Sequence, residues 1–180
     1  AAFDAFRVLC AHRQGAEGVA GLNQKIERAL EGAGLLSPRG EWYLYRPLMV
    51  LENDYQVGLF NGDTGMILDV DGERRAVFVT ADGSARSVAP ARLPRHETVF
   101  AMTVHKSQGS EFRRVALVLP SKVSPVLTRE LIYTGVTRAQ DSVVVYGSPA
   151  VLRVAVCAKV QRASGLRDLL WDPGGIVAER

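Results

Sequence analysis

The sequence predicts an α/β protein, with a parallel sheet covered by helices on both faces and a small β unit inserted into it. Two observations predict this class. Unbroken apolar runs alternate with helical patterns near both ends of the chain, which is typical of strands buried in a parallel sheet. Residues 61–94 differ, because they are rich in Gly and Asp and hold short β-type runs separated by turn pairs.

The chain opens with a predicted strand, loop and helix. Residues 5–11 form a short apolar run, as expected of a buried strand. Apolar residues then recur at helical spacing, at Val19, Leu22, Ile26 and Leu30. Gly32 and Gly34 are expected to end this helix.

The middle of the chain predicts β-hairpins. Asp71-Gly72 and Asp82-Gly83 each lie between strand-like runs, and such a pair is a strong short-range hairpin signal. We expect a meander or barrel of three to five strands. A unit of about 40 residues is near the lower limit for independent folding, so it should pack on its host.

The α/β rhythm returns near residue 98. Apolar strands are expected over residues 99–102, 115–119 and 142–146, with a helix over 128–139 between the last two. A further helix is expected to open at Ser148-Pro149, because serine before proline is a common helix start.

Composition places few limits on function. The 180 residues carry a net charge of +3, which is compatible with nucleic acid binding without being diagnostic. The two cysteines are expected to be buried free thiols of a cytoplasmic protein. No run approaches about 18 apolar residues, so no membrane span is expected. Clustered metal-binding carboxylates are absent from the sequence, so neither a metal site nor a nuclease centre is predicted.

A polar loop follows the predicted strand over residues 99–102. Seven of its side chains can form hydrogen bonds: Thr103, His105, Lys106, Ser107, Gln108, Ser110 and Glu111. Open α/β sheets bind ligands at the carboxyl ends of their strands, and Gly109 permits a backbone that exposes amides to phosphate. The alternative is an ordinary polar connection.

A second segment of interest runs from Leu131 to Gln140. Its pattern is helical, and Arg138 lies close to its end. The planar guanidinium could reach a nucleotide γ-phosphate. The alternative is a solvated charge near a helix C-terminus.

Together these segments resemble motifs V and VI of superfamily 1 DNA helicases, in residues 103–112 and 133–139. The resemblance is closest to the RecD-like group, the exodeoxyribonuclease V alpha subunit and its relatives. Residues 8–13 are similar to motif IV. Asn53-Asp54 and residues 58–63 are similar to the segment leading into the inserted β domain of this family.

The resemblance implies a RecA-like domain 2A over residues 1–58 and 99–180, with an SH3-like domain 2B inserted at residues 59–98. In this family two RecA-like domains clamp ATP, and their closure ratchets single-stranded DNA. Arg138 would be the catalytic arginine finger. The implied ATP-binding residues are Arg13, Gly109, Glu111 and Arg138. The implied DNA-binding residues are Thr103, His105, Lys106, Ser107 and Gln108.

The same resemblance implies partners outside the chain. The sequence holds no Gly-x-x-x-x-Gly-Lys-Ser/Thr phosphate loop and no apolar strand ending in paired acidic residues. ATP and Mg²⁺ should therefore be held by the N-terminal domain of a longer parent protein, and the fragment alone should be inactive. Recombination and double-strand-break repair, within or outside a multi-subunit helicase-nuclease, are the implied roles. Two alternatives stay open, a non-enzymatic nucleic-acid-binding module and a subunit-assembly domain, both using the insert.

Overall fold

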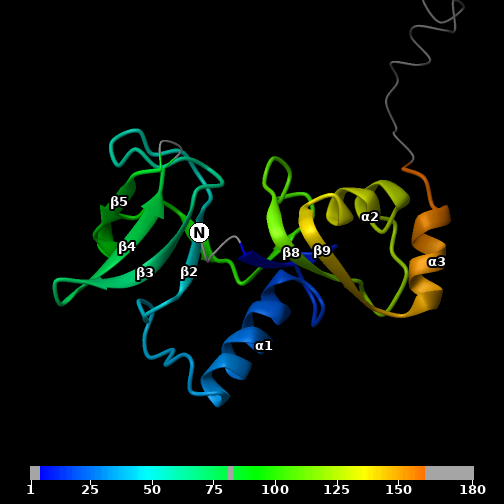
Figure 1. Ribbon diagram of the computed structural model, residues 1–180, viewed down its shortest axis with the longest axis horizontal. Coiled ribbons are helices and arrows are strands. Elements are labelled where there is room, and N and C mark those ends of the chain that lie inside the picture. The colour runs from blue at the N-terminus through cyan, green and yellow to red at the C-terminus, as the bar shows by residue number, and fades with distance from the viewer. Residues whose placement is uncertain (1–4, 81–82, 161–180) are drawn as a thin grey trace, which may run out of the picture.

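The computed structural model describes residues 5–80 and 83–160 and contains two sheets (Figure 1). The strands of the first sheet are β1 (Phe6–Cys10), β7 (Ala101–Thr103), β8 (Phe112–Val118) and β9 (Ala139–Tyr146). They pair in the order β7-β1-β8-β9, and every pair is parallel. The predicted parallel sheet is confirmed.

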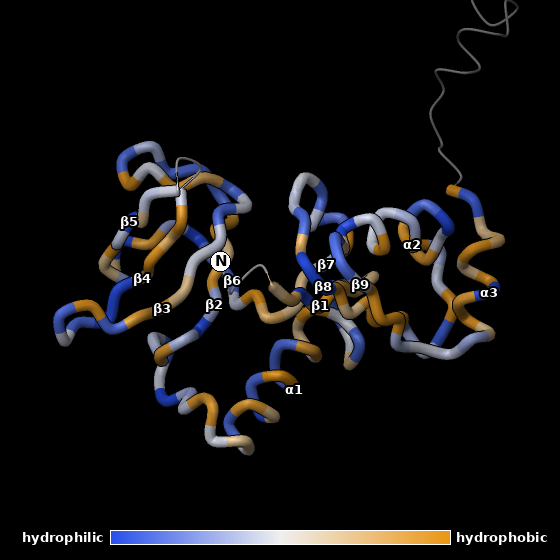
Figure 2. The backbone as a smooth tube through the Cα atoms, in the orientation of Figure 1, coloured by the Kyte–Doolittle hydropathy of each residue, from blue (hydrophilic) through white to orange (hydrophobic). Residues whose placement is uncertain are grey.

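Helices lie on both faces of this sheet. They are α1 (Val19–Gly32), α2 (Arg129–Val136) and α3 (Pro149–Cys157). Val8 of β1 lines a groove with Ile26 of α1, whereas the next residue, Leu9, shares a buried cluster with Leu131 of α2. Because successive strand side chains point to opposite faces, α1 and α2 cover opposite faces. In Figure 2, hydrophobic and hydrophilic bands alternate along α1, as expected of a helix with one side packed on a sheet.

The second sheet is antiparallel. Its strands are β2 (Pro47–Val50), β3 (Thr64–Val70), β4 (Glu73–Val79), β5 (Ala85–Val88) and β6 (His96–Thr98), and a short 3-10 helix, η2 (Pro90–Arg92), precedes β6. They pair in the order β5-β4-β3-β2-β6. The sheet has five strands, within the predicted three to five. Its strand β2 lies before residue 59, where the insert was predicted to begin. The SH3-like barrel and the division into two domains stay predictions.

The turn between β3 and β4 follows from its sequence. Asp71 and Gly72 both adopt positive φ, of 54° and 84°, which is the conformation that a two-residue hairpin needs. The Asp69 carboxylate accepts a hydrogen bond from the Gly72 amide at 2.9 Å. The first predicted Asp-Gly hairpin is therefore confirmed, and the second falls partly outside the described residues.

Each sheet has its own buried cluster. One cluster joins the parallel sheet to α2 and α3 through residues such as Leu9, Leu117 and Ile132, and the other fills the antiparallel sheet around Phe78. Cys10 is buried as expected, but Cys157 is exposed, so the prediction of two buried thiols is wrong for Cys157. Its position at the end of α3 leaves its side chain outside the helix packing. In the described part of the chain, no helix has the length and apolar character needed to cross a membrane.

Candidate functional site

The predicted site residues lie at two opposite ends of the parallel sheet. Cys10 and Thr103 end β1 and β7 in register with each other, so the residues that follow them lie at the carboxyl edge. Arg138 comes immediately before β9 and therefore lies at the amino edge. β9 has eight residues, and a rise of about 3.3 Å per residue separates the two edges by roughly 23 Å.

Arg138 is held at the amino edge by three neutral oxygen atoms. Its Nε donates to the Thr134 carbonyl at 3.2 Å, its Nη1 to the Ser110 carbonyl at 3.1 Å, and its Nη2 to the Thr137 hydroxyl at 3.4 Å. Its own carbonyl accepts from the Phe112 amide at 2.8 Å. Among the described residues Arg138 forms no ion pair, so no carboxylate there neutralises this positioned guanidinium.

The end of the polar loop lies beside Arg138. Glu111 comes directly before β8 and accepts a hydrogen bond from Gln140 Nε2 at 3.1 Å. Gly109 has a φ of 86°, a left-handed conformation that favours glycine. The structure thus brings together three of the four predicted ATP-binding residues: Gly109, Glu111 and Arg138.

The middle of the loop connects the two edges and lies beside α2. Ser107 is completely buried, and its hydroxyl donates to the Val104 carbonyl at 2.8 Å, so in this conformation the serine shapes the turn instead of facing solvent. His105 and Gln108 are exposed and line a cavity of about 440 Å³ together with Thr134 of α2. These two predicted DNA contacts are the accessible ones in this part of the loop.

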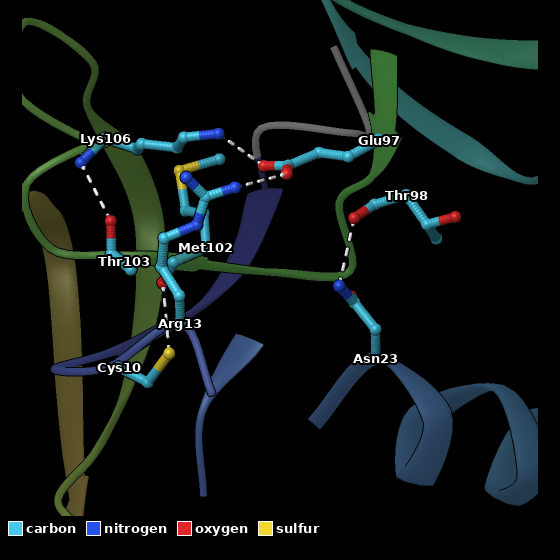
Figure 3. A network of polar contacts seen from close by, with 8 residues as sticks. All are labelled: Cys10, Arg13, Asn23, Glu97, Thr98, Met102, Thr103 and Lys106. Carbon is cyan, nitrogen blue, oxygen red and sulfur yellow. Dashed lines mark hydrogen bonds and ion pairs between the residues drawn. The ribbon is translucent and has the colours of Figure 1, made fainter. Parts of the chain in front are cut away.

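The fourth predicted ATP-binding residue, Arg13, lies at the carboxyl edge instead. Its Nη2 is 3.4 Å from Oε2 of Glu97, whose other oxygen is 2.5 Å from Lys106 Nζ (Figure 3). The Lys106 amide donates to the Thr103 hydroxyl at 3.2 Å. Arg13 is therefore grouped with the predicted DNA-binding residues Thr103 and Lys106, and apart from Arg138.

The connection between the two sheets is fixed beside this group. Asn23 of α1 donates from Nδ2 to the Thr98 carbonyl at 3.0 Å and accepts from the Ala101 amide at 2.9 Å. Arg46 Nε donates to the Thr98 hydroxyl at 3.0 Å. Residues 98–101 are thus tied to both α1 and the segment before β2, which fixes β6 and its Glu97 relative to the parallel sheet (Figure 3).

Sequence reasoning missed Glu97 and Asn23. Asn23 gave a signal that could have been used, since it follows Leu22 in a helix whose other inward positions are apolar. A polar residue there needs buried partners. Glu97 gave no such signal, because its cationic partners lie 84 and 9 residues away in the chain. Among the residues described, no cluster of His, Cys, Asp and Glu could hold a metal ion.

Comparison with known proteins identifies the family of the chain. The sequence profile of the UvrD-like helicase C-terminal domain matches residues 98–146, which contain the polar loop and α2. The chain is also 45% identical over 174 residues to the RecBCD enzyme subunit RecD of Mycobacterium tuberculosis. The chain belongs to the UvrD-like helicase C-terminal domain family.

Other relatives of this helicase domain are similar over most of its length. The ATP-dependent RecD2 DNA helicase of Deinococcus radiodurans is 34% identical over 154 residues, which are 84% of the chain and 21% of that protein. The match to Mycobacterium tuberculosis RecD covers 97% of the chain and 30% of that protein. The helicase domain therefore spans less than a third of the curated relatives it matches.

A solved structure has the same fold. The Pif1 helicase from Bacteroides, in complex with ADP-AlF3 and single-stranded DNA, superimposes with a TM-score of 0.51 and 15% identity. The match covers 79% of this helicase domain and 40% of the Pif1 chain. At this identity the similarity is one of fold alone, and it agrees with the parallel sheet and its helices.

Proposed function

We propose that this helicase domain is the C-terminal motor half of an ATP-dependent superfamily 1 DNA helicase of the RecD type. Two relatives carry names that support this, a RecBCD enzyme subunit and an ATP-dependent DNA helicase. The parent protein would act in DNA recombination and double-strand-break repair. Its partners would be single-stranded DNA and, if it works in a complex, other subunits of a helicase-nuclease.

The arrangement of Arg138 carries the proposal. A guanidinium has five N–H donors, and neutral acceptors occupy one on Nε and one on each terminal nitrogen. The donors that remain, and the full positive charge, are available to an anion. A cation already fixed in place needs little reorganisation when negative charge develops on a transferring phosphoryl group.

The chemistry would be phosphoryl transfer from ATP to water. Arg138 would stabilise the charge on the equatorial oxygens of the γ-phosphoryl, an effect worth about three to five orders of magnitude in rate. Gly109 and Glu111, beside it, would face the same nucleotide. The ATP and the Mg²⁺ that neutralises its phosphates would be held by the N-terminal ATP-binding domain of the parent, so this chain alone would not turn over ATP.

Single-stranded DNA would be bound by the polar loop. Thr103 and Lys106 lie at the carboxyl edge, and His105 and Gln108 line the cavity next to α2. Ser107 would act by holding the turn in shape. An SH3-like domain 2B, built from the antiparallel sheet, would guide the single-stranded DNA beside the polar loop. The polar loop itself, with Arg138, would belong to a RecA-like domain 2A.

The test is DNA-stimulated ATP hydrolysis by the full-length parent protein. Arg138→Ala should lower kcat at least a hundredfold while DNA binding and the folded state persist. Arg113→Ala is the matched control, because Arg113 lies near the same edge with its side chain 69% exposed and paired to Asp141. Near-normal turnover in Arg138→Ala would overturn the arginine-finger assignment.

The same measurement separates the proposed motor function from its two rivals. A non-enzymatic nucleic-acid-binding module or a subunit-assembly domain has no use for a guanidinium held in position by neutral oxygens at the amino edge. In either case Arg138→Ala would leave ATP turnover intact. For the assembly domain, the substitution would instead weaken association with other subunits, which co-purification of the complex would report.

A further inference from the structure

Two cations at the carboxyl edge share a single carboxylate. Glu97 contacts Lys106 with one oxygen and Arg13 with the other (Figure 3). The three side chains come from different parts of the fold: Arg13 follows β1, Lys106 follows β7, and Glu97 belongs to β6 of the other sheet. The group therefore carries one positive charge in excess.

The geometry points to a phosphate site formed by Arg13 and Lys106, with Glu97 as the anion that occupies it until the backbone of single-stranded DNA replaces it. This inference rests on the proposed helicase function and refines it. It moves Arg13 from the nucleotide side to the DNA side, and it gives Glu97 a role that the sequence did not indicate.

The position of Arg13 favours DNA over nucleotide. Arg13 lies at the same edge as Thr103 and Lys106, while Arg138 and Glu111 lie at the far end of the strands, roughly 23 Å away along the sheet. A γ-phosphate in contact with Arg138 is therefore out of reach of Arg13. A phosphate in contact with Lys106 is within reach of Arg13, because both cations already contact the same carboxylate.

The two contacts of Glu97 differ in strength. The Arg13 side chain is 64% exposed and its contact is long, at 3.4 Å, so this pair contributes little to stability. The Lys106 contact is short and its side chain is 27% exposed, which keeps the ammonium in a fixed place. A DNA phosphodiester also carries a single negative charge spread over two oxygens, and its binding releases counterions from the DNA.

Replacing Glu97 by Gln tests the inference, because it removes the charge and keeps the shape. In the full-length protein, Glu97→Gln should bind a labelled oligothymidylate about fivefold more tightly at low salt, the effect of one unit charge at about 4 Å in water. The plot of log affinity against log salt should steepen by up to about 0.7, the counterion release of one phosphate contact on a single strand, because Glu97 no longer competes with the phosphate for the two cations. Glu31→Gln, on exposed α1 surface, makes the same change in net charge and should alter neither quantity.

Further variants separate the possible outcomes. Lys106→Gln should weaken binding, flatten the salt dependence and abolish the gain from Glu97→Gln in the double variant. If Lys106→Gln and Arg13→Gln weaken binding but Glu97→Gln binds no better than Glu31→Gln, or binds less tightly, Glu97 only supports the fold and the inference is overturned. If neither cation affects binding, or the protein does not bind the oligonucleotide, the DNA contacts of the proposed function fail instead. Thermal unfolding of each variant reports whether the fold is kept.

Discussion

Replacing Asn23 by Ala should destabilise the chain through the connection between its two sheets. The Asn23 side chain makes two hydrogen bonds to that connection, one to the Thr98 carbonyl and one from the Ala101 amide. Asn23 is 9% exposed and Ala101 is fully buried. Water cannot reach the Ala101 amide to replace the lost partner.

The expected cost follows from these two bonds. Each contributes about 1 kcal/mol to stability, and a buried donor left without an acceptor costs about 1–3 kcal/mol. Since Thr98 is partly exposed and its carbonyl can turn to water, most of the penalty comes from Ala101. We expect Asn23→Ala to lower the free energy of unfolding by about 2–4 kcal/mol in total.

Urea unfolding followed by circular dichroism measures this change. With a slope of about 2 kcal/mol per molar urea, the midpoint should fall by about 1–2 M. Asn53→Ala is the control, because Asn53 also accepts a backbone hydrogen bond, from the Asn61 amide at 2.9 Å, but at the exposed surface. That variant should change stability by less than about 0.5 kcal/mol. A loss in Asn23→Ala no larger than the control's would refute the reasoning.

Two further predictions concern a thiol and a helix cap. Burial raises the pKa of Cys10 from 9.0 to about 11, so at pH 8 only the exposed Cys157 should react with a thiol reagent in the native state, and both should react in denaturant. Because the folded pKa lies above the unfolded one, the contribution of Cys10 to stability is full below pH 9 and is lost as the pH rises towards 11. Rapid native labelling of both thiols would contradict this. Thr128 caps α2 by accepting from the Leu131 amide at 3.3 Å, so Thr128→Ala should cost about 1 kcal/mol in urea unfolding. Thr128→Ser should restore most of it, and equal losses in both variants would point to packing instead.

Two strands, β8 and β9, begin earlier than their sequence patterns predicted. β8 begins at Phe112, three residues before the predicted run, and it includes the exposed Arg113 and Arg114. Arg114 still pairs in register with Phe6 of β1, although its charge breaks the apolar pattern. In the same way α2 ends at Val136, earlier than predicted, because Ala139 pairs with Phe112 and joins β9.

β2 was missed for a different reason. Its four residues, Pro47–Val50, are all buried, but they lie before the stretch rich in turns that marked the insert. Their partners are β3 and β6, and the latter is about 50 residues further along the chain. A short apolar segment gives no local sign of which distant strands it will join.

The sequence by itself determined the alternation of strands and helices, the Asp-Gly hairpin and the two long motifs that mark a helicase domain, because each is written in neighbouring residues. Only the tertiary structure decided that Arg138 is held by neutral oxygens, with no counterion among the described residues, and that Arg13 lies with Lys106 on Glu97 at the opposite edge of the sheet. The physical reason is that an ion pair depends on a separation of a few ångströms, and Arg13 and Glu97 are 84 residues apart in the chain. The packing of β1, β6 and α1 sets that separation.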